Sequence, residues 1–90
     1  MQIYSKTYCP FCHDVKSLFE NLQVPAKVVE LDELEDGQVV SEGLLKLTGK
    51  RTVPQVFVGG THVGGCDDTF AAYQNGRLKE LLASKGITIS

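Results

Sequence analysis

The first part of the chain follows a strand–helix–strand pattern, and this order restricts the fold more than any other feature of the sequence. Residues 2–5 and 27–31 are short segments typical of strands, the second rich in β-branched residues. Between them a helix is expected to begin at Cys9-Pro10, because proline suits the first helical position. Its buried face is marked by apolar residues at i, i+3, i+4 and i+7, namely Val15, Leu18, Phe19 and Leu22. Such a unit requires its two strands to run parallel.

The rest of the chain predicts a second helix, a hairpin and two further helices. In chain order, the expected segments are an acidic loop over 32–36, a helix ending near Gly49, a hairpin around Gly59-Gly60, and helices over 67–75 and 77–85. In the second helix, Val40, Leu44 and Leu47 are expected to be buried, because they recur at helical spacing. The predicted fold is α/β, with the order β-α-β-α-β-β-α-α and a four-stranded mixed sheet flanked by helices.

Length and composition allow one globular domain and exclude several classes of function. The chain has 90 residues, of which 42% are apolar, so residues 1–90 are expected to form a single small domain. A net charge of −2 and the lack of a basic block argue against nucleic-acid binding. No apolar stretch reaches the roughly 18–20 residues of a membrane span, and the first residues do not resemble a secretory signal.

Three cysteines are present, and two of them, Cys9 and Cys12, form a C-x-x-C pair at the expected start of the first helix. A small secreted domain stapled by disulfides usually carries an even number, so redox or metal chemistry in a reducing compartment is favoured. The thiolate is the reactive form, and the helix start, Lys6 and the neighbouring Cys12 all favour this form at Cys9. Cys9 is therefore predicted to be the nucleophile and Cys12 the resolving thiol.

Three other interpretations of the cysteine pair are weaker. Cys9 to His13 matches the C-x-x-C-H pattern of haem attachment, but the only methionine is Met1 and a packed strand–helix–strand unit leaves no pocket. A structural zinc site needs four ligands, and Cys66, His13 and His62 do not supply a second paired motif. Purely structural cysteines are disfavoured by the position at a helix start. We expect no metal.

Three segments in the right order resemble the glutaredoxin family. Residues 4–12, Tyr-Ser-Lys-Thr-Tyr-Cys-Pro-Phe-Cys, are similar to the active-site segment of dithiol glutaredoxins. Residues 52–58 and 64–68 are similar to the two glutathione-binding segments of that family. The resemblance covers the whole chain. It implies a thioredoxin fold in which the Val53–Pro54 peptide bond is cis and faces the active-site cysteine.

The same resemblance implies a glutathione site. Lys6 would bind the glycyl carboxylate, the backbone of Val53 would pair with the peptide, and Asp67 with the backbone around Cys66 would hold the γ-glutamyl end. The full set of expected glutathione-binding residues is Lys6, Tyr8, Phe11, Arg51, Thr52, Val53, Pro54, Gly65, Cys66, Asp67 and Asp68.

Some of these positions depart from the family pattern or have a structural alternative. Phe11 stands where many relatives carry tyrosine. Ser41 replaces a second-helix Gln or Arg that often meets glutathione, so Arg51 is expected to substitute as a carboxylate partner. Asp68 is expected to cap the third helix, and Asp67 both to cap it and to bind. Cys66 is expected to be a poorly reactive neighbour of the groove.

The implied function is glutathione-disulfide oxidoreductase activity, with Cys9 attacking glutathione mixed disulfides or protein disulfides. Glutathione would be the co-substrate, regenerated by glutathione reductase and NADPH, and the protein would act as a monomer. The alternative is a carrier glutaredoxin with a [2Fe–2S] cluster ligated by the first cysteine and glutathione, which the stiff Pro10 disfavours. A thioredoxin independent of glutathione is disfavoured by the absence of tryptophan. The expected location is cytoplasmic, or organellar if a targeting peptide has been removed.

Overall fold

The computed structural model describes residues 1–89. The elements within this range are β1 (Gln2–Ser5), α1 (Pro10–Asn21), β2 (Lys27–Glu30), the 3-10 helix η1 (Leu31–Glu33), α2 (Gly37–Thr48), β3 (Gln55–Val58), β4 (Thr61–Gly64), α3 (Cys66–Gln74) and α4 (Arg77–Ser84). The predicted order of strands and α-helices is confirmed. The short helix η1 was not predicted: β2 ends one residue early, and Leu31 turns inward to become buried.

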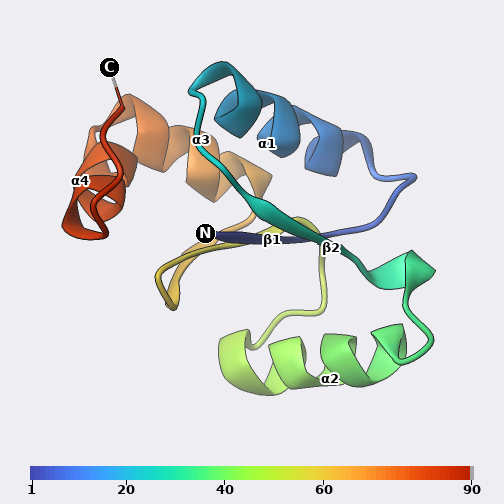
Figure 1. The fold of residues 1–90 in the computed structure, drawn as a ribbon. Helices are drawn as coiled ribbons and strands as arrows, with labels where there is room; N and C mark the ends of the chain where they lie inside the picture. Colours follow the sequence, from blue (N-terminus) through green and yellow to red (C-terminus); the bar gives the residue numbers. More distant parts are fainter. Residues whose placement is uncertain (90) are drawn as a thin grey trace.

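The four strands form one mixed sheet in the order β2-β1-β3-β4. Strand β1 pairs with β2 in parallel, as the strand–helix–strand pattern requires, and Ile3 lies opposite Val28. On its other side β1 pairs with β3 in antiparallel fashion, with Tyr4 opposite Gln55. Helices α1 and α3 cover one face of the sheet and α2 covers the other, as Figure 1 shows.

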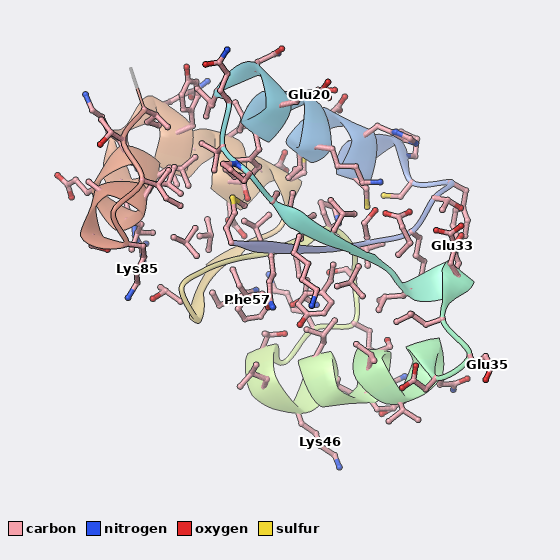
Figure 2. All side chains as sticks on the ribbon, in the orientation of Figure 1. Glu20, Glu33, Glu35, Lys46, Phe57 and Lys85 are labelled. Carbon is pink, nitrogen blue, oxygen red and sulfur yellow. The ribbon has the colours of Figure 1, made fainter. Side chains whose placement is uncertain are left out.

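Two apolar clusters lie on opposite faces of the sheet. Alternation along β3 sends Val56 and Val58 into the larger cluster and Phe57 into the smaller one. Figure 2 shows Phe57 between the sheet and α2. The larger cluster consists of Ile3, Val15, Phe19, Val24, Val56, Val58, Ala72, Leu78, Leu82 and Ile89. The smaller cluster consists of Leu31, Leu44 and Phe57.

The buried face of α2 differs from the prediction at Leu47, whose side chain is 73% exposed. Gly37 and Leu44 are buried, and Val40 is half-buried against the smaller cluster. Hydrophobic spacing therefore places Val40 and Leu44 correctly and fails at Leu47, in the last turn of the helix. No helix within residues 1–89 has the length and apolar character needed to cross a membrane.

Gly64 forms the junction between β4 and α3 and needs to be glycine. Its φ is +128°, and a Cβ there would clash with the carboxylate of Asp68. Gly43, by contrast, lies on the exposed surface of α2, and a Cβ there would meet no other atom within 4 Å.

These two glycines give opposite predictions for stability. Gly64→Ala should lower the free energy of unfolding by about 2 kcal/mol, because the backbone is strained and Asp68 must move. Gly43→Ala should raise it by about 1 kcal/mol, because alanine is the better helix former. Urea denaturation followed by circular dichroism measures both. A neutral effect at Gly64 would contradict the geometry assigned to this junction.

Candidate active site

Cys9 is the N-terminal cap of α1, in extended conformation, and its sulfur takes the place of a capping oxygen. The Cys12 N–H donates to Cys9 Sγ at 3.3 Å, and the Cys9 N–H donates to the Lys6 carbonyl at 3.1 Å. Cys9 is half-buried, so the sulfur can be reached from solvent. The free N–H groups of a helix start stabilise negative charge, so this position suits a thiolate.

The other two cysteines have surroundings that favour the neutral thiol. Burial raises the pKa of Cys12, and its contact with Cys9 raises it further. Burial also raises the pKa of Cys66, with the negative charges of Asp14 and Asp67 acting in the same direction. Cys12 is fully buried one turn beyond Cys9, as a resolving thiol should be, and Cys66 is half-buried.

The Val53–Pro54 peptide bond is cis, as the family resemblance implied. Cys9 Sγ lies 3.8 Å from the carbonyl oxygen of Val53, which accepts a hydrogen bond from the thiol. The segment before β3 is therefore placed directly against the Cys9 sulfur, although Cys9 and Val53 are 44 residues apart in the sequence.

A cavity of about 380 Å³ is lined by Val53, whose carbonyl contacts the Cys9 sulfur, and by most of the other expected glutathione-binding residues. Cys9 itself does not line it. Eight of the eleven line it: Phe11, Thr52, Val53, Pro54, Gly65, Cys66, Asp67 and Asp68. Three residues that the sequence did not suggest complete the lining: Lys50, Gln55 and His62. The helix start of α3 and the segment before β3 thus form the two walls of one cavity.

The remaining three expected residues, Lys6, Tyr8 and Arg51, line a second cavity of about 280 Å³ beside α2. The Lys6 ammonium lies 6.0 Å from the centroid of the Tyr8 ring, within range of a cation–π contact. Arg51 Nη2 lies 2.9 Å and 3.1 Å from the two carboxylate oxygens of Glu42. The sequence treated Arg51 as a carboxylate partner for a ligand, but in the structure it is already paired.

The two aspartates at the start of α3 have different roles. Asp68 Oδ2 accepts a hydrogen bond from the Gly65 N–H at 3.3 Å, so the expected capping role is confirmed for Asp68. No hydrogen bond of the Asp67 side chain is found within residues 1–89, so the capping role expected for Asp67 is wrong. Its exposed carboxylate borders the first cavity.

A clamp between Thr7 and Asp32 holds the loop that leads to Cys9. The Thr7 N–H donates to Asp32 Oδ1 at 3.0 Å, and the Thr7 hydroxyl donates to Oδ2. These bonds, with a smaller effect of the Lys6 charge, lower the pKa of the exposed Asp32 carboxyl. The ring nitrogen Nε2 of His13 lies 3.0 Å from the Thr7 carbonyl. Sequence reasoning missed this clamp, because Asp32 belongs to an acidic stretch that looks like a solvated loop.

The described residues offer no clustered metal ligands: within residues 1–89, no group of three or more His, Cys, Asp or Glu side chains is arranged to hold a metal ion. All three cysteines are free thiols. The arrangement is therefore a dithiol site, with an accessible sulfur on a helix start and a buried sulfur one turn behind it.

Comparison with known proteins agrees with this class of site. The family described as Glutaredoxin matches residues 1–63. Glutaredoxin-C6 of Oryza sativa subsp. japonica is 50% identical over 88 residues, covering 98% of this chain and 79% of the rice protein. The crystal structure of the buckwheat glutaredoxin–glutathione complex superposes with a TM-score of 0.92 at 42% identity, covering 97% of this chain and 79% of that one.

A glutaredoxin of Ricinus communis is also 50% identical, over 84 residues that cover 93% of this chain and 82% of the relative. The fold and the paired thiols define a thioredoxin-fold protein of the thiol oxidoreductase class. Within that class, the chain belongs to the glutaredoxin family.

The surroundings of the three thiols predict selective alkylation. At neutral pH, iodoacetamide should modify Cys9 first, because Cys12 is buried and the pKa values of Cys12 and Cys66 are raised. The rate of Cys66 modification should increase only when the pH exceeds the ordinary pKa of a cysteine thiol, because the pKa of Cys66 is raised. Peptide mapping by mass spectrometry measures the three rates separately. Modification of Cys66 as fast as Cys9 at neutral pH would contradict this assignment.

Proposed function

We propose that this glutaredoxin is a glutathione-disulfide oxidoreductase that reduces glutathione mixed disulfides and protein disulfides. The observation that carries the proposal is the position of the Cys9 sulfur, on a helix start and 3.8 Å from the carbonyl of Val53, which lines the first cavity. A thiolate there can attack a disulfide whose glutathione half lies along that cavity. The complex of the buckwheat relative with glutathione supports this choice of ligand.

Each part of glutathione has a chemically matched partner in the two cavities. The Val53 N–H has no hydrogen-bond partner within residues 1–89, and it can pair with the peptide backbone as an added strand does. Asp67 can bind the γ-glutamyl ammonium, while the N–H groups at the start of α3 bind the adjacent carboxylate. Lys6 matches the glycyl carboxylate. The further proposed contacts are Tyr8, Phe11, Arg51, Thr52, Pro54, Gly65, Cys66 and Asp68.

The proposed reaction is a sequence of thiol–disulfide exchanges. The Cys9 thiolate attacks the glutathione sulfur of a mixed disulfide; the new S–S bond forms as the old one breaks, and the substrate leaves as a thiolate that takes up a proton. A second glutathione thiolate then attacks the glutathione sulfur of the Cys9–glutathione disulfide. This releases glutathione disulfide and restores the Cys9 thiolate. With a protein disulfide as substrate, Cys9 bonds to one protein sulfur while the other leaves as a thiolate that takes up a proton. Cys12, one turn away, then attacks the Cys9 sulfur, which releases the second protein thiolate and forms a Cys9–Cys12 disulfide. Two glutathione molecules reduce this disulfide in turn and leave as glutathione disulfide.

The proposed partners are glutathione, proteins that carry disulfide or glutathionyl groups, and, indirectly, glutathione reductase with NADPH. We propose that residues 1–90 act as one monomeric glutaredoxin domain in the cytoplasm. The small and odd number of cysteines, three, supports a reducing compartment. The net charge of −2 supports a protein that does not bind nucleic acid.

The two aspartates of α3 provide a matched pair of variants. Asp67→Ala should raise the KM for a glutathionylated peptide about fivefold with little change in the free energy of unfolding, because its carboxylate makes no internal bond. Asp68→Ala should instead lower the free energy of unfolding by about 1 kcal/mol, because it removes the cap on Gly65. Steady-state kinetics and urea denaturation measure both. An unchanged KM for Asp67→Ala would count against the proposed γ-glutamyl contact.

The roles of the thiols are tested by turnover of a glutathione mixed disulfide coupled to NADPH oxidation by glutathione reductase. Cys9→Ser should lose activity on both glutathionylated and disulfide-bonded proteins, because it removes the nucleophile. Cys12→Ser should keep most of its activity on glutathionylated substrate and lose much of its activity on protein disulfides. Cys66→Ser is the control and should match the parent protein, because Cys66 is proposed to contact glutathione through its backbone and not through its thiol. If Cys12→Ser is as inactive as Cys9→Ser in deglutathionylation, a dithiol cycle replaces the proposed mechanism.

A further inference from the structure

Gln55, the first residue of β3, is a polar residue in a strand whose four residues are all buried. Its side chain is only 1% exposed. A buried amide without partners costs free energy, so the groups that it contacts indicate why a glutamine can occupy this position.

Both N–H groups of the Gln55 side-chain amide donate hydrogen bonds to the loop that precedes β3. Nε2 donates to the carbonyl of Lys50 at 2.8 Å and to the carbonyl of Thr52 at 3.0 Å. Because only the amide nitrogen can donate to two carbonyls, the orientation of the side chain is fixed by chemistry. On its other side, Gln55 Oε1 lies 3.1 Å from the hydroxyl of Thr48, the last residue of α2.

Side-chain contacts, rather than backbone hydrogen bonds, hold this loop. Within the described chain, no backbone–backbone hydrogen bond outside the sheet and helices involves residues 50–54. The Lys50 N–H is held by the Thr48 hydroxyl at 3.2 Å, and the Val53 carbonyl faces the Cys9 thiol at 3.8 Å. The Thr48 hydroxyl also lies 3.2 Å from the Lys50 carbonyl, and Arg51 pairs with Glu42, so side chains of α2 hold the first part of the loop. The Gln55 amide adds two bonds, and the one to the Thr52 carbonyl acts next to Val53, which lines the first cavity.

We propose that Gln55 is a positioning residue: its amide holds the loop from Lys50 to Thr52 so that Val53 presents its backbone to glutathione beside Cys9. The proposal rests on the proposed glutathione site and adds a residue that acts through the loop. Gln55 does not act on the reacting sulfur, so its loss should weaken binding of glutathione and leave the chemistry at Cys9 intact.

Two variants of similar length remove the donors. Gln55→Met replaces the amide by an apolar group. Gln55→Glu replaces the donating NH2 group by a carboxylate oxygen, which cannot donate to the Lys50 and Thr52 carbonyls and repels them. Each should raise the KM for a glutathionylated peptide about tenfold, while kcat and the rate of Cys9 alkylation stay within about twofold of the parent. Leu82→Ala, on the buried face of α4, is the control for general destabilisation and should leave the KM within about twofold at a temperature where the variant is folded.

A second measurement uses the unaltered protein and does not depend on how the variants fold. In nitrogen-15 NMR spectra, the two Nε2 protons of Gln55 should exchange slowly with solvent. They should also shift when glutathione is attached to Cys9, because the loop and the ligand are in contact. Rapid exchange of these protons, or a KM for folded Gln55→Met equal to that of the parent, would overturn the positioning role. Failure of the parent to turn over the glutathionylated peptide would instead overturn the proposed function.

Discussion

The site depends on one short-range interaction, the hydrogen bond from the Cys12 N–H to the Cys9 sulfur at 3.3 Å. It makes the reactive sulfur the cap of α1, so the charge that develops on this sulfur lies where a helix best stabilises negative charge. The same geometry buries Cys12 one turn behind, where burial raises its pKa. Two chemically identical side chains thus acquire different reactivity from a separation of three residues.

The site also needs a surface beside the Cys9 sulfur, and the arrangement of the strands provides it. Since β1 and β3 are antiparallel, with Tyr4 opposite Gln55, the end of β1 lies next to the beginning of β3. The chain that leaves β1 leads to Cys9, and the chain that enters β3 carries Val53, so the two meet. The β3–β4 hairpin then returns the chain so that α3 starts on the far side of the same cavity.

Polar contacts fix the loops around this frame. Thr7 and Asp32 hold the loop before α1, and Gln55 holds the loop before β3. The Arg51–Glu42 pair lies at the surface, with 58% and 43% of the two side chains exposed, and ion pairs at such positions contribute little to stability. The proposed contact of Arg51 with a glutathione carboxylate would therefore cost little stability where it replaces the pair with Glu42.

By itself the sequence determined the order of the elements and the position of the cysteine pair at the start of α1, because hydrophobic spacing, Pro10 and the C-x-x-C spacing are local signals. Only the tertiary structure decided where the buried face of α2 ends, that Arg51 is already paired, and that Gln55 holds the Lys50 and Thr52 carbonyls. The physical reason is distance along the chain and the nature of the contacts. Polar bonds between loops depend on where the sheet brings backbone carbonyls and carboxylates together, and no spacing within a single segment encodes that position.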